Sequence, residues 1–158
     1  MIHRRAFVMR IAGLFAAGVT VKRLSAQVSL LGPASTPITV YKSSTCGCCA
    51  KWVDHLRANG FATTVRDEEK MDQIKDQLGV PQTLRSCHTA VLDKYLVEGH
   101  VPAADLHRLL SQRPKVAGLA VPGMPSRSPG MAGPGDKIEG FEVVAFQADG
   151  GSSTFARY

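Results

Sequence analysis

The chain has 158 residues, of which 44% are hydrophobic and 20% charged, and its formal net charge is +6. Five basic residues and no acidic ones lie within residues 1–26, so the net charge of the remainder is +1. A charge this small gives no support for binding to nucleic acid or to a membrane surface. About 132 residues remain after this segment, which is enough for one compact domain.

The first 26 residues are typical of an export signal. The basic stretch MIHRRAFVMR precedes the apolar run IAGLFAAGVTV and the small residues near Ala26. The apolar run is shorter than the ~20 residues of a membrane-spanning helix, so we expect a removed signal rather than a retained anchor. The segment RRAFV is similar to a twin-arginine signal, although general export signals also carry paired arginines. We expect residues 27–158 to form a periplasmic protein with no stable membrane insertion.

Strand-like and helix-like patterns alternate from residue 37 onward. In chain order we predict a strand (37–44), a helix (49–60), a strand (61–68), a helix (68–79), a strand or short hairpin (90–99), and a helix (102–112). The first helix places Trp52, Val53 and Leu56 on one face, and Asn59-Gly60 ends it.

The C-terminal part has a different amino-acid composition. Residues 121–136 are dense in Pro, Gly and Met and cannot hold a regular element, so we predict a loop. FEVVAFQ, ADGG and STFARY then predict a β-hairpin. Together the elements predict an α/β, thioredoxin-like sandwich with a C-terminal β-hairpin extension, formed by the single domain at 27–158.

Three cysteines lie within four positions, at the turn from the first predicted strand to the first helix. Cys46 and Cys49 form a C-x-x-C pair, and Cys48 stands between them. A pair at a helix N-terminus suits thiol–disulfide exchange, because the helix dipole favours the thiolate. A third thiol gives such an enzyme a competing disulfide partner. Structural disulfides are a further alternative, since exported chains meet an oxidising compartment.

Metal binding explains the third cysteine best. Thiolate ligands select Cu(I), zinc or iron–sulfur clusters. Zinc fits less well, because adjacent Cys48 and Cys49 reach one tetrahedral ion with difficulty. Cu(I) accepts low coordination numbers and bridging sulfurs, so neighbouring cysteines can each hold a different ion. We therefore predict several Cu(I) ions per chain.

Other residues are candidates to complete this site. Cys87 precedes the third predicted strand, where it can approach the turn, and His88 follows it as a second candidate ligand. Met124 and Met131 carry soft thioethers in the loop, although each could instead fill a gap in the core. His100 is predicted either as a ligand or as a turn residue.

Several further residues are predicted to serve folding alone. We expect Trp52 in the core, Glu98 as a solvated turn charge, and His55 and His107 at solvated or packing positions. No phosphate-binding glycine loop, nucleophile elbow or paired-carboxylate pattern supports a hydrolase.

The chain resembles the CopG-type exported copper-resistance proteins. The resemblance rests on CGCC followed by AKW, then GVP, SCHTA, EGHVP and PGMP…SPGM, in that order over residues 37–147. It implies a thioredoxin-like domain that binds a multinuclear Cu(I) cluster through Cys46, Cys48, Cys49 and Cys87. The loop departs from the family pattern at Arg127, where Gly is usual, and at Ala132, where Glu is usual.

The predicted function is copper resistance or homeostasis in the periplasm, through a copper-thiolate cluster. Copper ions are the expected ligand, and periplasmic copper-handling or electron-transfer proteins are candidate partners. Storage, transfer and copper redox chemistry all remain open. The alternative is a thiol–disulfide oxidoreductase, in which Cys46 is the nucleophile and Cys49 the resolving thiol.

Overall fold

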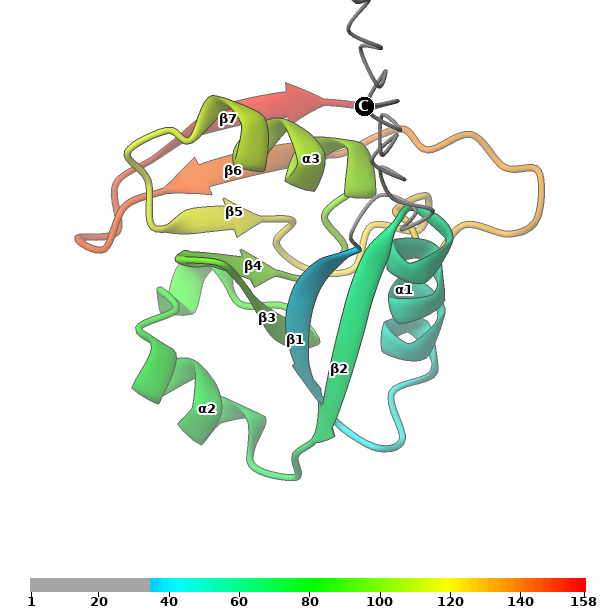
Figure 1. Cartoon of the computed structure of the whole chain (residues 1–158), viewed down its shortest axis with the longest axis horizontal. Helices are drawn as coiled ribbons and strands as arrows, with labels where there is room; N and C mark the ends of the chain where they lie inside the picture. Colours follow the sequence, from blue (N-terminus) through cyan, green and yellow to red (C-terminus); the bar gives the residue numbers. More distant parts are fainter. Residues whose placement is uncertain (1–34) are drawn as a thin grey trace, which may run out of the picture. The chain divides into compact units, whose positions relative to one another are not determined.

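The computed structural model describes residues 35–158, and the predicted export signal at 1–26 lies outside the described residues. Figure 1 shows three helices and one large sheet. The elements are β1 (Thr36–Lys42), α1 (Gly47–Ala58), β2 (Phe61–Asp67), α2 (Met71–Leu78), the 3-10 turn η1 (Gln82–Leu84), β3 (His88–Leu92), β4 (Tyr95–Glu98), α3 (Ala103–Gln112), β5 (Gly118–Ala120), β6 (Glu142–Phe146) and β7 (Ser152–Arg157). The mixed α/β class is as predicted, and residues 90–99 adopt the hairpin alternative.

All seven strands belong to one mixed sheet, in the order β2-β1-β3-β4-β5-β6-β7. The pairs β1·β2 and β4·β5 are parallel, and the other neighbouring strands are antiparallel. The parallel pair β1·β2 is connected through α1, as a crossover requires. This connection places the α1 N-terminus, and with it the cysteine turn, at the end of β1.

The helices cover both faces of the sheet. Figure 1 shows α1 and α2 on opposite sides of the β1–β2 pair. Trp52 and Leu56 of α1 and Leu106 and Leu109 of α3 belong to one buried apolar cluster with the sheet. Their spacing of three or four residues puts each pair on one side of its helix. Trp52 is fully buried, so its predicted place in the core is confirmed.

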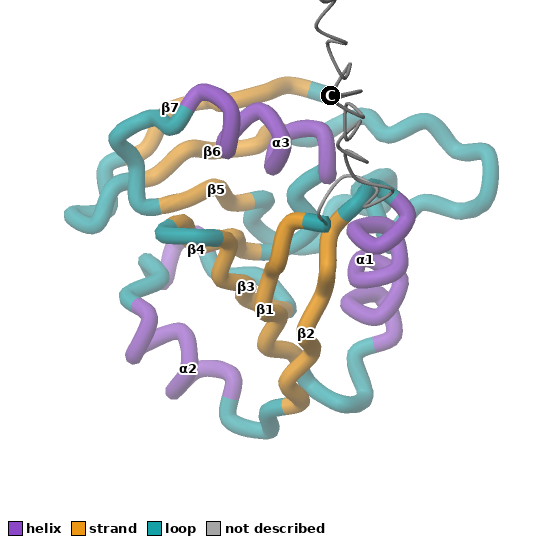
Figure 2. Tube along the Cα trace, viewed as in Figure 1, coloured by secondary structure: helices purple, strands orange, loops and turns teal. Residues whose placement is uncertain are grey.

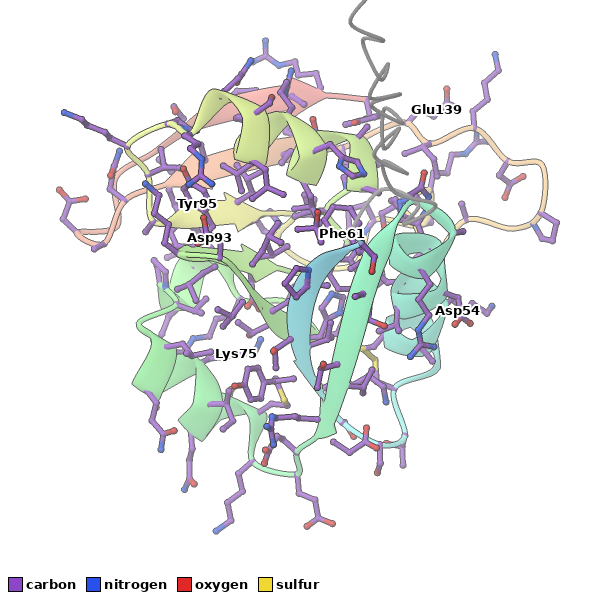
Figure 3. The ribbon with its side chains drawn as sticks, in the orientation of Figure 1. Asp54, Phe61, Lys75, Asp93, Tyr95 and Glu139 are labelled. Carbon is purple, nitrogen blue, oxygen red and sulfur yellow. A yellow bond between two sulfur atoms is a disulfide. The ribbon has the colours of Figure 1, made fainter. Side chains whose placement is uncertain are left out.

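A buried polar network joins α2 to the opposite face of the sheet. Figure 3 shows Lys75 between α2 and the strands. Its Nζ lies 2.5 Å from Glu98 Oε1 and donates to Thr89 Oγ1 at 2.8 Å. The other Glu98 oxygen accepts from Thr89, and Oε1 also accepts from the Ser86 backbone N–H at 2.6 Å. The prediction that Glu98 is a solvated turn charge is therefore wrong, because tertiary partners compensate its burial.

Strand β5 was not predicted, and it joins the C-terminal hairpin to the rest of the sheet. It lies between β4 and β6 and has only three residues, too few to show a periodicity. A side chain at Gly118 would collide with the carbonyl oxygen of Leu96 on β4. The short strand thus depends on a close backbone approach. The hairpin β6–β7 extends the sheet beyond β5.

The segment between β5 and β6 is one long loop, as predicted for its Pro/Gly/Met-rich part at 121–136. Figure 2 shows it running from the sheet past α1. Its start and middle pack against the domain, since Val121 and Ser128 are fully buried. Within residues 35–158, none of the helices has the length and apolar character needed to cross a bilayer.

Candidate metal centre

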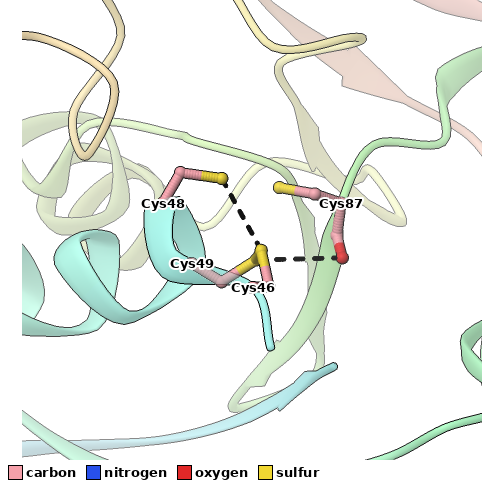
Figure 4. Close-up of side chains that lie close together, drawn as sticks. All are labelled: Cys46, Cys48, Cys49 and Cys87. Atoms are coloured by element: carbon pink, nitrogen blue, oxygen red, sulfur yellow. Dashed lines mark hydrogen bonds between the residues drawn. A yellow bond between two sulfur atoms is a disulfide. The ribbon is translucent and has the colours of Figure 1, made fainter. Parts of the chain in front are cut away.

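The four cysteines converge at the start of α1. Cys46 is the residue that precedes the helix, and Gly47, Cys48 and Cys49 form its first turn. Cys87 reaches the same place from the segment just before β3. The Sγ atoms of the four cysteines all lie within 4.8 Å of one another (Figure 4). Residues 38 positions apart in the chain therefore form one cluster of sulfurs.

The cluster contains both oxidised and reduced sulfur. Cys46 and Cys49 form a disulfide, whereas Cys48 and Cys87 are free. The Sγ atoms of Cys46 and Cys48 lie 3.6 Å apart, and Cys49 Sγ lies 3.9 Å from the Cys87 carbonyl oxygen. Cys49 is fully buried, and Cys48 and Cys87 are partly exposed. Reduction of the single disulfide would make all four sulfurs available to one ligand.

Two electrostatic effects act on these thiols. The N-terminus of α1, where Cys46, Cys48 and Cys49 lie, carries free backbone N–H groups and the positive end of the helix dipole, which favour negative charge at this place. Burial raises the pKa of Cys87 to about 11, and the neighbouring Cys48 adds to this increase. Without a metal ion, Cys87 is therefore a protonated thiol at neutral pH.

Two histidines flank the Cys87 sulfur. His88 Nδ1 lies 3.3 Å from Cys87 Sγ, and His100 Nε2 lies 3.2 Å from it. Both rings are fully buried, and they stack with centroids 5.3 Å apart. The His88 ring also lies against Trp52, at 4.2 Å between centroids. Cys87, His88 and His100 thus form a second group of close donor atoms that shares Cys87 with the cysteine cluster.

Burial keeps both imidazoles neutral. It lowers the pKa of His88 well below its ordinary value, with the charges of His100 and Lys75 as further causes. Burial likewise lowers the pKa of His100 to about 4. A neutral imidazole is the form that can bind a metal ion.

The Pro/Gly/Met-rich loop at 121–136 packs against the turn at Cys46–Cys49 through residues other than its methionines. Gly130 has a φ of +91°, and a Cβ there would lie 2.7 Å from the Cys48 carbonyl oxygen. Ser128 is fully buried and contacts His100. Met124 and Met131 are 55% and 36% exposed, so neither fills a gap in the core. Their predicted role as copper ligands stays a prediction.

The other two histidines of the described chain have packing roles. His55 Nε2 accepts the backbone N–H of Ala103 at 3.1 Å. His107 Nε2 lies 2.9 Å from the Asn59 carbonyl oxygen, and its ring packs on Phe61. Their predicted assignment to solvated or packing positions is confirmed.

The buried histidines make the copper-free protein sensitive to acid. The folded state holds the pKa of His100 at about 4, whereas an unfolded chain has an ordinary value near 6.5. The unfolded state therefore binds more protons between these values, and the free energy of unfolding falls as the pH falls below 6.5. We expect His100 to contribute a loss of at most about 2 kcal/mol between pH 7 and pH 5, measured by urea denaturation.

The variant His100→Gln is the control for this expectation, because glutamine does not titrate. Its free energy of unfolding should change less between pH 7 and pH 5 than that of the wild type. An equal pH dependence in both proteins would contradict the assignment to His100.

Comparisons with known proteins identify the family of the chain. A family model described as "Protein of unknown function, DUF411" matches residues 84–131, which include Cys87, His88, His100 and both loop methionines. Two solved structures, named "Copper resistance protein copG- Form 1" and "Form 2", are each 46% identical to the chain with a TM-score of 0.72. Each comparison covers 78% of this chain and 98% of the solved chain. The chain belongs to the CopG copper-resistance family. A search of curated proteins found no match.

Membership of the CopG family confirms the resemblance seen in the sequence. The near-complete cover of the solved CopG chains means that the described domain corresponds to the whole of those structures. The cysteine cluster of this chain therefore occurs in a protein of a copper-resistance family. Its four sulfurs are soft ligands of the kind that Cu(I) prefers.

Sequence reasoning missed three features around the centre. It left His100 undecided between ligand and turn residue, it assigned no role to Ser128, and it put Glu98 in solvent. The glycine between Glu98 and His100 was the one signal in the sequence. In the structure Gly99 has a φ of +69°, and a Cβ there would collide with Val121 and Ser86, so the position requires glycine.

Proposed function

We propose that the protein is a periplasmic copper-resistance protein that holds several Cu(I) ions in a cluster of copper and thiolates. Cys46, Cys48, Cys49 and Cys87 supply the sulfur ligands. The domain that carries them is thioredoxin-like, an assignment supported by the β1-α1-β2 connection with the cysteines at its first turn. Residues 1–26 direct its export. Periplasmic copper-handling or electron-transfer proteins are its candidate partners, and copper redox chemistry is a candidate activity.

One observation carries this proposal: four Sγ atoms lie within 4.8 Å of one another. A thiol–disulfide oxidoreductase needs two of them, and a stable fold needs none in this arrangement. Four thiolates around one point would repel each other strongly unless cations lie between them. Monovalent copper supplies that charge, and thiolate sulfur is the ligand type that it prefers.

Copper content per chain tests the proposal. The protein is reduced, reconstituted with Cu(I) without oxygen, and desalted, beside a sample whose Cys46–Cys49 disulfide is left intact. We expect at least two tightly held ions per reduced chain and fewer in the oxidised sample, because two ligand sulfurs are then bonded to each other. Cys87→Ser should also hold fewer ions than the wild type. Loss of all copper on desalting would refute the cluster.

A thiol–disulfide oxidoreductase is the second candidate, and the Cys46–Cys49 disulfide favours it. In this reaction a Cys46 thiolate attacks a substrate disulfide, and Cys49 then displaces the bound thiol and closes the observed bond. Such an activity needs no metal. It predicts reduction of a model disulfide by the copper-free protein and loss of that activity in Cys46→Ser.

Copper affinity is expected to depend on pH through Cys87. Because the pKa of Cys87 is about 11 without metal, binding of copper to its thiolate releases a proton at every pH below that value. We expect this thiol alone to weaken the apparent affinity about tenfold for each unit of pH decrease. Competition with a Cu(I) chelator between pH 6 and pH 9 measures the slope.

Cys87→Ser is the control for the pH dependence of copper affinity. It should reduce the slope by about one proton per chain, since serine releases no proton in this range. An unchanged slope would mean that Cys87 does not bind copper as a thiolate.

A further inference from the structure

We infer that Glu98 is a positioning residue for Cys87, and that helix α2 supports Glu98 through Lys75. The inference rests on the proposed function, because Cys87 is one of the four thiolates of the proposed cluster. It assigns a role to a buried ion pair and to a helix that lie outside the cluster of sulfurs.

The backbone next to Cys87 is held by side-chain contacts. Cys87 lies in the connection at 85–87, between η1 and β3, where the chain belongs to no helix or strand. The Ser86 backbone N–H donates to Glu98 Oε1 at 2.6 Å, and the Ser86 hydroxyl donates to the Gly123 carbonyl oxygen. The Glu98 carboxylate thus holds the residue directly before Cys87 from strand β4.

The Glu98 carboxylate is itself fixed by its other partners. Oε1, the oxygen that accepts from Ser86, also lies 2.5 Å from Lys75 Nζ, and Oε2 accepts from the Thr89 hydroxyl at 2.6 Å. Hydrogen bonds to an ionised group are short and strong. Because Glu98 is fully buried, water offers its carboxylate no alternative partner. Ser86 therefore has an acceptor at a fixed place.

Helix α2 is attached to the domain mainly through this connection. Lys75 is the one buried residue of α2, and within residues 35–158 neither buried apolar cluster includes a side chain of this helix. A surface helix usually docks through an apolar face. Asp76 of α2 also pairs with Arg85 at 2.5 Å. Both contacts of α2 thus lead to the residues directly before Cys87.

Stability alone does not account for the buried pair. The cost of burying two charges offsets much of their attraction, and apolar side chains of similar volume often replace such a pair without loss of stability. Apolar side chains, however, would leave the Ser86 N–H without an acceptor. Holding the connection beside Cys87 is therefore the contribution that only the polar pair can make.

Two double variants separate positioning from stability. Lys75→Met with Glu98→Gln removes both charges and keeps a carbonyl oxygen for the Ser86 N–H, while the Thr89 hydroxyl can accept from the new amide. Lys75→Met with Glu98→Leu also removes both charges, but it leaves Ser86 without this acceptor. Neither variant keeps a buried charge at these two positions, so their difference isolates the hydrogen bond to Ser86.

Hydrogen exchange of the Ser86 amide and alkylation of the Cys87 thiol measure the effect in the copper-free protein. The Cys46–Cys49 disulfide is left intact and Cys48→Ser is added, so that Cys87 is the single free thiol. We expect both rates to be about tenfold higher in the leucine variant than in the glutamine variant, because loss of the hydrogen bond favours opening of the connection. Equal rates in the two variants would overturn the inference.

Exchange at the Leu109 amide separates positioning from a purely structural role. Leu109 is fully buried on α3, so its amide reports opening of the core. We expect it to exchange at the same rate in both variants. An increase at Leu109 as large as that at Ser86 would mean that the hydrogen bond stabilises the whole domain, and it would overturn the positioning role.

Copper affinity separates this inference from the proposed function. It is measured by competition with a Cu(I) chelator, on reduced protein with all four cysteines. Loss of a group that orients a metal ligand typically weakens affinity 10–100-fold, and we expect such a loss in the leucine variant relative to the glutamine variant. Equal affinities would overturn the role of Glu98 and leave the cluster intact. If the wild type holds no copper, the proposed function fails, and the role of Glu98 in copper binding fails with it.

Discussion

Replacing Glu98 with glutamine is expected to destabilise the copper-free protein by about 3–5 kcal/mol, because it leaves the Lys75 charge buried without a counter-charge. Lys75 is 3% exposed, and Glu98 is fully buried. Glutamine has nearly the same shape, and its carbonyl oxygen can still accept from the Ser86 backbone N–H. The variant thus removes the charge and turns the oxygen that accepts from the Thr89 hydroxyl into a donor. Urea denaturation at pH 7 measures the change in the free energy of unfolding.

Glu142→Gln is the matched control for this substitution. Glu142 pairs with Arg157 at 2.7 Å on the exposed hairpin β6–β7. Exposed ion pairs contribute little to stability, so the control should leave the unfolding midpoint almost unchanged. Equal effects of the two variants would show that Lys75 and Glu98 contribute no more than a surface pair. Adding Lys75→Met to Glu98→Gln should recover part of the lost stability, because no buried charge then remains.

The second large effect is expected at Cys48. Cys48→Ser should lower the number of copper ions that the reduced protein holds after desalting, because the cluster loses one of its four thiolates. Oxygen is a harder ligand than sulfur and binds Cu(I) poorly, so serine does not replace the lost thiolate. Metal analysis per chain, beside the wild type, measures the change.

The same variant separates the two candidate functions. Cys48 lies outside the Cys46–Cys49 disulfide, so an oxidoreductase should keep its activity on a model disulfide in Cys48→Ser and lose it in Cys46→Ser. A copper-binding protein should hold less copper in both variants. Unchanged copper content in Cys48→Ser, together with disulfide reduction that needs Cys46, would favour the oxidoreductase.

Local patterns in the chain were sufficient for α1, α2 and α3 and for β1, β2, β6 and β7, and they left one strand or a hairpin open where β3 and β4 lie. The apolar faces of α1 and α3 appear at intervals of three and four residues, and Asn59-Gly60, Gly79 and Pro102 mark the ends of helices. These signals act over short distances, so they are present in the sequence itself. Strand β5 was not predicted, because its three residues show no pattern of their own and pair with β4 and β6.

At the candidate metal centre, local patterns in the chain predict three cysteines at one helix N-terminus and Cys87 as their candidate partner. These follow from residue spacing, because a strand-to-helix turn brings neighbours together regardless of the rest of the fold. The packing of the fold brings Cys87, His88 and His100 together, and it puts Ser128 in contact with His100 from a loop 28 residues away in the chain. It also decided that Glu98 is buried with Lys75. Such contacts depend on how β3, β4 and the loop pack together, and no local pattern of residues encodes that packing.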